Sequence, residues 1–476
     1  MKTWLAILTL FITTAIFAQK NISLEDILRW SGSQTFDFQK AEKEFQISFW
    51  QYRYHLSNNK PRLMFNGDLP NFSRTIIPVT QNDGVEAFRE RSLATSLVEL
   101  SIAQNIASTG TTIFASSQLN RIDVFQPTNA VSYLAYPALV GIRQPLGSFN
   151  AMRWENKIQP IRYQESQKKF KEDAEMAKVK GMQLFFQLLL EQENLQMLEK
   201  QKIFSDSLFV LAQKRFSVGK ITENELLRNE INYLQAEQEL TQGRNQYEFA
   251  LRQFQSYFKL NENVQLQYPS ELVAEINLEI ALERFRKNSR KSIEIQRKIT
   301  EADKELAQAR ANAGLKADIS LAFGLSKDGQ TIRDVYRNVK DQENARISFQ
   351  IPILDWQRGK SQVRVAQLQK EMILQETERE MQELELELEL QIKNWLVAQK
   401  QLEIAKKNQT IARKVYLMTY QEYLNGNTNL SELERAFASQ SLSQQNYLKQ
   451  LEAIWVGYYK IRLLTLYDFE KNLPLD

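Results

Sequence analysis

Leucine and glutamate alternate in the C-terminal half of the chain. Residues 383–390 read ELELELEL, and the 66 residues from Lys360 to Asn425 contain neither glycine nor proline. Strict alternation by two is typical of a half-buried strand, but a run of this length without a breaker favours a helix, which would extend ~100 Å at the usual rise per residue. We therefore predict that residues 383–390 are helical.

The leucines of this helix form two seams. At ~100° per residue, Leu384 and Leu388 lie on one side and Leu386 and Leu390 on the opposite side, with glutamates between them. A surface helix or a two-stranded coiled coil needs only one apolar stripe. Two opposed seams suit a helix that packs on a neighbour at each side, as one stave of a wall with water inside and outside. A solvated charged helix with additional leucines is the alternative interpretation.

Other segments alternate with a period of two over shorter lengths. The apolar positions predicted for one face are Ile319, Leu321, Phe323 and Leu325, then Ile347, Phe349 and Ile351, and upstream Leu134, Tyr136, Ala138, Val140 and Ile142. Strands of ~10 residues with one apolar and one polar face are typical of membrane β-barrels with a wet lumen. A hairpin that covers a hydrophobic core gives the same pattern. Residues 98–106 and 111–119 are further candidate strands, and the pattern does not decide which pair enters a barrel.

The chain contains a tandem repeat. FSVGKITENELLRN at 216–229 is echoed by YLNGNTNLSELERA at 423–436, an offset of 207 residues that also relates Pro145 to Pro352. Upstream, ISLEDIL at 22–28 resembles INLEIAL at 276–282, and here the offset is 254 residues. The first copy therefore carries 47 additional residues between about 61 and 144, where several glycines, prolines and asparagines predict loops and short strands.

Each copy is predicted to form a helix, a strand hairpin, a very long helix, a glycine turn and a second long helix. The first copy spans 19–268, with a strand region at 61–145, long helices at 148–260 and a turn near 216–225. The second copy spans 269–476, with a strand region at 315–353, long helices at 356–467 and a turn near 423–432. About two strands per copy cannot close a barrel, and an open edge in lipid leaves backbone groups unpaired. Closure therefore requires several chains.

Charge balance and the scarcity of reactive side chains narrow the function. The 61 basic and 57 acidic residues nearly cancel, which is unlike the electrostatic footprint of a nucleic-acid-binding protein. With no cysteine and a single histidine, His55, a thiolate nucleophile, a thiolate zinc site and a multi-histidine metal site are excluded. We predict no catalytic residue, no metal site and no cofactor, and we interpret His55 as a polar residue near a helix end. An enzyme is the least favoured class.

The N-terminus has the pattern of a secretory signal peptide. Lys2 precedes an apolar run from Trp4 to Phe17, and Ala18 is a small residue at which we predict cleavage, so that residues 1–18 are removed. A membrane-anchoring helix is the alternative, but the run is shorter than the ~20 apolar residues that span a bilayer. No other segment is long and apolar enough for a transmembrane helix, so any membrane span is predicted to consist of strands.

The repeat layout, the strand ends at Pro145 and Pro352, and the turns FSVGKITENELL and YLNGNTNLSEL resemble TolC-type outer-membrane efflux proteins. The resemblance covers essentially the whole mature chain. It implies a mainly α fold with a small β-barrel part: a homotrimer whose 12-stranded barrel in the lipid of the cell outer membrane continues as an α-helical barrel in the periplasm. It also implies the function of an exit duct in a tripartite efflux or type I secretion system. The implied partners are a periplasmic adaptor protein and an inner-membrane transporter of the RND or ABC type.

The two glycine turns are implied to form the periplasmic tip. By resemblance, the corners Val218-Gly219-Lys220 and Asn425-Gly426-Asn427 dock the adaptor, while Tyr423, Glu225 and Glu432 belong to the constriction of the tunnel mouth. The position of the family's arginine is Thr428 here, and the second acidic position of its cation-sensitive ring is Arg435. We therefore expect closure by packing and hydrogen bonds in place of a salt-bridged latch. The alternative interpretations are that the two turns are ordinary helix corners and that both glutamates are first-turn carboxylates that interact with the helix dipole.

A soluble periplasmic coiled-coil scaffold or adaptor with an accessory β-domain is the competing function. It requires one apolar seam per helix and no lipid-facing strand. The resemblance favours a passive conduit, in which Glu225 and Glu432, each repeated by symmetry, make conductance sensitive to cations and pH. The sequence does not identify the cargo.

Overall fold

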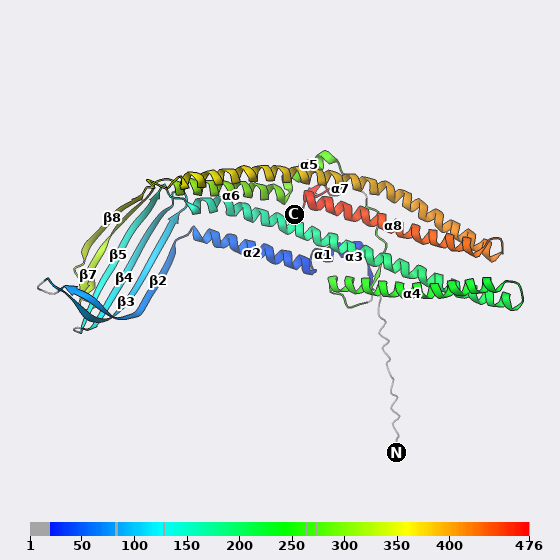
Figure 1. Cartoon of the computed structure of the whole chain (residues 1–476), viewed down its shortest axis with the longest axis horizontal. Helices are drawn as coiled ribbons and strands as arrows, with labels where there is room; N and C mark the ends of the chain where they lie inside the picture. Colours follow the sequence, from blue (N-terminus) through cyan, green and yellow to red (C-terminus); the bar gives the residue numbers. More distant parts are fainter. Residues whose placement is uncertain (1–19, 81–83, 127–128, 263, 273, 476) are drawn as a thin grey trace, which may run out of the picture. The chain divides into compact units, whose positions relative to one another are not determined.

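The computed structural model describes residues 20–80, 84–126, 129–262, 264–272 and 274–475, so the predicted signal peptide at 1–18 lies outside the described part (Figure 1). The helices are α1 Leu24–Ser31, α2 Phe36–Asn58, α3 Ala151–Ser217, α4 Glu223–Phe258, α5 Leu278–Asn288, α6 Arg290–Ala313, α7 Arg358–Leu424 and α8 Leu430–Thr465, with a 3₁₀ turn at Asp334–Tyr336. The strands are β1 Lys20–Ile22, β2 Arg62–Thr80, β3 Glu86–Ile106, β4 Thr111–Gln126, β5 Ala130–Leu146, β6 Val264–Leu266, β7 Lys316–Gly329, β8 Lys340–Gln350, β9 Tyr467–Asp468 and β10 Leu473–Pro474.

The long helices repeat with the predicted period. Helices α3 and α7 have 67 residues each, and α4 and α8 have 36 residues each. Helices α7 and α8 begin and end 207 residues after α3 and α4, their counterparts in the first copy. The predicted fold class, mainly α with tandem repeats and a smaller β part, is confirmed. None of the helices within the described ranges is long and apolar enough to cross a membrane.

The chain folds into two compact units that each combine parts of both repeats. We call them the helical unit, which comprises the described residues of 1–45, 167–292 and 382–476, and the sheet unit, which comprises those of 46–166 and 293–381. In the helical unit, Phe185, Leu189, Phe254 and Trp395 are among the fully buried side chains. The indole Nε1 of Trp395 in α7 donates a hydrogen bond to the backbone oxygen of Ile454 in α8 at 3.1 Å.

Residues 383–390 lie inside α7, so the helical prediction for the leucine and glutamate repeat is confirmed. The two predicted seams have different surroundings in the single chain. Leu388 is completely buried, whereas Leu386 and Leu390 are 64% and 55% exposed. One seam therefore packs within the chain, and the other has an apolar surface that a further neighbour could cover.

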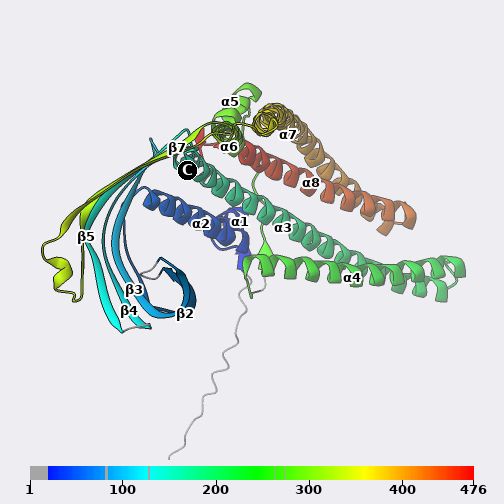
Figure 2. The ribbon, with the colours of Figure 1, turned by 60° about the vertical axis from the view of Figure 1, so that its left-hand side comes forward.

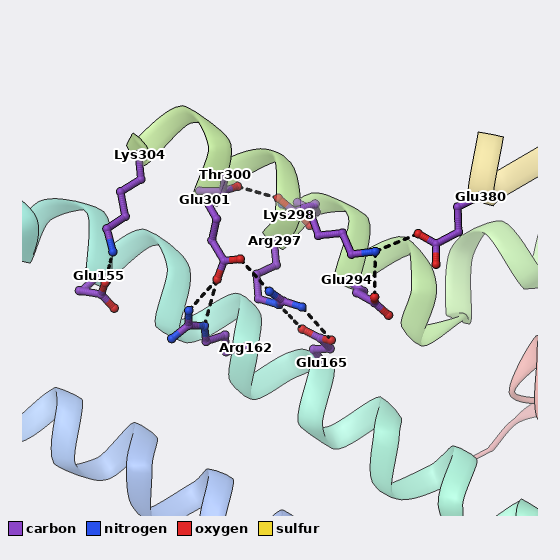
Figure 3. A network of polar contacts seen from close by, with 11 residues as sticks. Glu155, Arg162, Glu165, Glu294, Arg297, Lys298, Thr300, Glu301, Lys304 and Glu380 are labelled. Atoms are coloured by element: carbon purple, nitrogen blue, oxygen red, sulfur yellow. Dashed lines mark hydrogen bonds and ion pairs between the residues drawn. The ribbon is translucent and has the colours of Figure 1, made fainter. Parts of the chain in front are cut away.

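Four helix segments of the sheet unit lie side by side in the order α2, α3, α6, α7. The rings of Tyr52 in α2 and Tyr163 in α3 stack with their centroids 4.8 Å apart. A network of ion pairs then joins α3 to α6 and α6 to α7 (Figure 3). Its N–O distances are 2.6 Å for Arg297–Glu165, 2.6 Å for Arg162–Glu301, 2.7 Å for Lys304–Glu155 and 2.9 Å for Lys298–Glu380. Because each helix packs on the next, these segments form a continuous wall.

The sheet has six strands in the order β2-β3-β4-β5-β7-β8, and every neighbouring pair is antiparallel (Figures 1 and 2). The prediction of about two strands per repeat is therefore wrong for the first repeat, which contributes four. The additional residues form long paired strands in place of the predicted loops and short strands, because β2 and β3 pair along nearly their whole length despite Gly67 and Pro70. The candidate strands at 98–106 and 111–119 lie in β3 and β4.

One face of the sheet is apolar and exposed on all six strands. Its large exposed side chains include Leu63 and Phe65 in β2, Leu100 and Ile102 in β3, Ile113 in β4, Val140 and Ile142 in β5, Leu321 and Phe323 in β7, and Ile347 and Phe349 in β8. The hydrogen-bonded register brings these positions to the same face, since direct cross-strand partners share a face.

The predicted face of two residues in β5 is wrong. Tyr136 pairs with Gln118 and Leu134 pairs with Asn120, on the polar face, although simple alternation places both beside Val140. The reason is a bulge at Pro137, where β5 has one residue more than β4 and β7 on either side. A bulge reverses the alternation beyond it, and proline cannot donate a ladder hydrogen bond.

Candidate functional site

The two glycine turns of the helical unit have the same backbone geometry. Gly219 has φ +67° and Gly426 has φ +78°. In the first turn Lys220 N donates to Arg215 O at 2.8 Å and Gly219 N donates to Phe216 O at 2.9 Å. In the second turn, the equivalent bonds run from residue 427 to residue 422 at 2.8 Å and from residue 426 to residue 423 at 3.1 Å. Both are Schellman motifs, in which a left-handed glycine lets two terminal carbonyls of a long helix find donors.

Side-chain caps begin the second helix of each pair. Thr222 Oγ1 accepts a hydrogen bond from Glu225 N at 3.3 Å, and Asn429 Oδ1 accepts one from Glu432 N at 3.0 Å. The carboxylates of Glu225 and Glu432 therefore occupy the first turns of α4 and α8, where the helix dipole favours negative charge. The exposed corner residues Val218, Gly219 and Lys220, and likewise 425–427, lie outside the helices.

The predicted constriction residues have different local partners. Tyr423 at the end of α7 is half-buried, and burial raises the pKa of its phenol; the charge of Arg215 opposes this shift, and the carboxylates of Glu225 and Glu434 add to it. Tyr423 and Glu225 are thus brought into electrostatic range of each other. Glu432 instead accepts a hydrogen bond from Thr428 Oγ1 at 2.6 Å, from the position where the family's arginine was expected.

A polar link between the repeats was missed by the sequence reasoning. Asn232 Nδ2 in α4 donates a hydrogen bond to Glu434 Oε1 in α8 at 2.5 Å. Partial burial raises the pKa of the Glu434 carboxyl. The only sequence signal for this residue is a departure from the repeat, because the position 207 residues earlier is Leu227.

A cleft of about 490 Å³ lies between α3, α4 and α8 in the helical unit. Its lining includes Phe204 and Leu208 from α3, Asn232 from α4, and Glu434, Phe437, Ala438 and Ser441 from α8. The α3 side of the cleft is mainly apolar but also has Gln201 and Ser205, the α4 side is polar, and the α8 side is mixed. In the first repeat, the α3 surface is therefore covered by a helix of the second repeat.

The equivalent surface of the second repeat is open. Ile411 and Val415 of α7 stand 207 residues after Phe204 and Leu208, and they line a hollow of about 590 Å³ between α7 and α8. Both side chains are about half exposed. They continue a stripe of exposed apolar residues on α7 at seven-residue spacing, Leu390, Val397, Ile404, Ile411 and Met418.

A matching apolar stripe is exposed on α4. Leu227, Ile231 and Leu234 are each at least half exposed. They stand 207 residues before Glu434, Ala438 and Ser441, the α8 residues that face α3 across the cleft. By the repeat, the α7 stripe is the equivalent of the α3 surface, and the α4 stripe is the equivalent of the α8 surface. Inside the chain α3 and α8 face each other, whereas the α7 and α4 stripes are exposed.

Within the described ranges, no group of three or more His, Cys, Asp or Glu side chains is arranged to hold a metal ion.

Comparison with known proteins gives a family and a fold. The sequence profile of outer membrane efflux proteins matches residues 94–257 and 286–454, more than half of the chain. No protein among the curated sequences matches. The outer membrane channel CmeC of Campylobacter jejuni has the same fold, with a TM-score of 0.66 at 12% sequence identity over 94% of this chain and 88% of that one.

Two further solved structures share the fold. A membrane protein from Pseudomonas aeruginosa has a TM-score of 0.66 at 12% identity, with 93% of this chain and 90% of that chain covered. CusC, whose crystal structures describe transmembrane channel formation, has a TM-score of 0.63 at 13% identity, with 93% and 91% covered.

Proposed function

Because the chain belongs to the outer membrane efflux protein family, it is an outer-membrane efflux channel that extends into the periplasm, and we propose that three copies form its duct. The duct is passive. It receives cargo from an inner-membrane transporter of the RND or ABC type through a periplasmic adaptor, as the exit component of a tripartite efflux or type I secretion system. The chain catalyses no reaction, and the partners supply direction.

The exposed apolar stripe on α7 is the observation that supports the proposed trimer. Inside the chain, α3 of the first repeat is covered by α8 of the second. In a closed ring of alternating repeats, α7 is covered in the same way by α4 of the next chain. This contact brings Leu227, Ile231 and Leu234 against Ile411 and Val415, so that apolar surface exposed in the single chain is buried.

The sheet supports the same proposal against the competing scaffold. A soluble scaffold would hold the apolar side chains of six strands in water, including Phe65 and Phe349, which are both exposed. A contiguous apolar face of this kind marks a surface that contacts lipid or another protein. In the proposed duct this face contacts the outer-membrane lipid, and the polar face lines the lumen.

The glycine turns are proposed to form the periplasmic tip. The exposed corners Val218-Gly219-Lys220 and 425–427 dock the adaptor, and Tyr423 and Glu225 narrow the opening. Closure rests on the packing of Tyr423 and on hydrogen bonds such as that between Thr428 and Glu432, in place of a salt-bridged latch. With three chains, the carboxylates of Glu225 and Glu432 are each present three times at the tip and make conductance sensitive to cations.

The trimer interface is tested by polar substitution of the α7 stripe. Ile404→Gln with Ile411→Gln changes side chains that are about half or more exposed in the single chain, so we expect a monomeric, folded protein in detergent and loss of channels in planar bilayers. The matched control is Arg413→Gln, which is exposed on the opposite side of the same helix and should leave the trimer intact. Mass measurement by light scattering reads out the assembly. A double variant that remains trimeric with normal conductance contradicts the proposed interface.

A further inference from the structure

The first repeat contributes two strands more than the second, and the proposed trimer does not by itself determine whether they belong to the barrel wall. Helix α2 leads into β2, β5 leads into α3, α6 leads into β7, and β8 leads into α7. The two remaining strands, β3 and β4, have no helix of their own and lie between β2 and β5. Four strands per chain would form a barrel of twelve strands across three chains, and six would form one of eighteen.

We propose that all six strands enter the barrel wall, so that the trimer closes an 18-stranded barrel in which β2 of one chain pairs with β8 of the next. This inference rests on the proposed trimeric duct and deepens it, because it determines the width of the exit through the membrane. The occupant of each open sheet edge is a second copy of this chain.

The first argument is that the apolar face, which would contact lipid, is continuous across the sheet. The direct cross-strand partners Leu63, Ile102, Ala115, Val140 and Phe323 form one row from β2 to β7. The large side chains of this row are exposed, including those on β2 and β3. A hairpin folded into a water-filled lumen, or one lying outside the membrane, would place Leu63, Phe65 and Leu100 in water. The apolar face is therefore as extensive on β2 and β3 as on the other four strands.

The second argument is width. At a tilt of ~40°, which is typical of membrane barrels, each strand occupies ~6 Å of barrel circumference, so six strands span ~38 Å and four span ~25 Å per chain. The wall of four helices per chain in the same unit spans ~32–40 Å at interaxial distances of 8–10 Å. Six strands therefore match the helix wall that they continue, whereas four would narrow it by about a third.

The edges of the sheet complete the argument. Strand β2 runs away from its helix and β8 runs toward its helix, so neighbouring chains meet antiparallel, as all pairs within the sheet do. Residues 62–69 of β2 contain no proline and can donate hydrogen bonds along the edge, and β8 contains none at all. An edge left unpaired in lipid would leave its backbone groups without hydrogen-bond partners, which closure avoids.

The consequence is a wide exit. An 18-stranded barrel has a backbone diameter of ~36 Å, compared with ~24 Å for 12 strands at the same tilt. The barrel therefore adds no constriction to the tunnel formed by the helices, and it suits bulky cargo.

Chain-to-chain cross-linking tests the proposal, and the absence of native cysteine makes every introduced thiol unique. Phe65→Cys on β2 is combined in turn with Ala345→Cys, Ile347→Cys or Phe349→Cys on β8 to scan the register. Within one chain these positions are five strand spacings, or ~24 Å, apart, so a disulfide between them joins two chains. We expect at least one pair to give covalent trimers, several-fold above the single-cysteine variants, after mild oxidation in detergent.

The matched control replaces the β2 cysteine by Ile113→Cys on β4, an interior strand in the 18-stranded arrangement. If the β2–β3 hairpin leaves the wall, β4 becomes the edge that meets β8. Covalent trimers from the β4 pairs, or none from any β2 pair in a detergent-stable trimer, would overturn the 18-stranded barrel while leaving the trimeric duct in place. A protein that is monomeric by light scattering and forms no channels rejects the proposed duct itself.

Discussion

The substitution Arg462→Met should destabilise the helical unit strongly. Arg462 in α8 is buried; its Nη1 donates to Asp468 Oδ2 at 2.7 Å, and its Nε and Nη2 donate to Glu175 at 3.2 and 3.3 Å. The Tyr458 hydroxyl donates to the other oxygen of Asp468 at 2.9 Å. Methionine fits the volume of the guanidinium stem but leaves two buried carboxylates without their shared cation. Glu175 keeps its ion pair with Lys178 at 2.6 Å, so the uncompensated charge is that of Asp468.

The expected loss follows from the burial of this ion triad. Removing one partner of a buried pair costs about 3–5 kcal/mol, because an uncompensated charge stays in a medium of low polarity. The helical unit contains ~270 residues, so its unfolding entropy is ~0.6 kcal/mol per kelvin at ~2.1 cal/mol/K per residue. The melting temperature should therefore fall by about 5–9 °C.

Thermal unfolding in detergent, followed by circular dichroism at 222 nm, measures the effect. The matched control is Arg252→Met in α4, whose guanidinium is exposed and pairs only loosely with Glu248 at 3.7 Å, so its change should stay within about 1 °C. The triple variant with Glu175→Gln and Asp468→Asn should regain part of the loss, since no buried charge then lacks a partner. An Arg462→Met protein that melts within 1 °C of the natural one would refute the argument.

The dependence of the melting temperature on pH tests the same ion triad in a second way. Burial opposes ionisation of Asp468, but Arg462 and the hydrogen bonds from Lys471 N and Tyr458 outweigh it, so the pKa of Asp468 lies below its ordinary value. A depressed pKa contributes stability above the unfolded-state value of about 4, and this stability is lost as the pH falls through the folded-state value. The difference in melting temperature between the natural protein and Arg462→Met should therefore shrink below about pH 4.

Three further substitutions test other parts of the molecule. Gly426→Ala has open space for its methyl group but strains the left-handed backbone by about 1 kcal/mol, so hydrogen exchange at the tip should rise about fivefold. The control Gly314→Ala should not change this exchange. Equal exchange in both variants would contradict the predicted strain. Arg297→Ala removes the cation that holds Glu301 at 2.7 Å in the sheet-unit network (Figure 3), and the melting temperature should fall by about 1–3 °C; no change would mean that solvent screens the network. Glu432→Ala should weaken block by divalent cations several-fold in single-channel recordings, and unchanged block would leave Glu432 as a helix-start carboxylate only.

Elements with local causes were predictable from the sequence. Neither α3 nor α7 contains a residue that ends the helix before the turns at Gly219 and Gly426. Each turn has a glycine in the left-handed conformation, and a capping residue follows within three positions. The alternation in 316–326 likewise matched β7, because each of its residues obeys the period of two. The repeat offset of 207 residues then located the counterparts of each element.

Features that depend on distant partners were not predictable. Strand β2 contains Gly67, Pro70 and Pro78, which read as turn signals, yet its pairing with β3 supplies hydrogen bonds that outweigh these local preferences. The bulge at Pro137 reversed a face because its position depends on how both neighbouring strands align. Arg462 gives no sign of burial in its own segment, since Glu175 lies 287 residues away in the chain.

The sequence by itself determined the repeat, the lengths of the helices and the positions of their turns, because these depend on the residues within a few positions of each end. Only the tertiary structure decided how many strands stand side by side, which face of each one is apolar, and which charges are buried together. Those properties arise from contacts between segments far apart in the chain, and local sequence does not specify the free energy of such contacts.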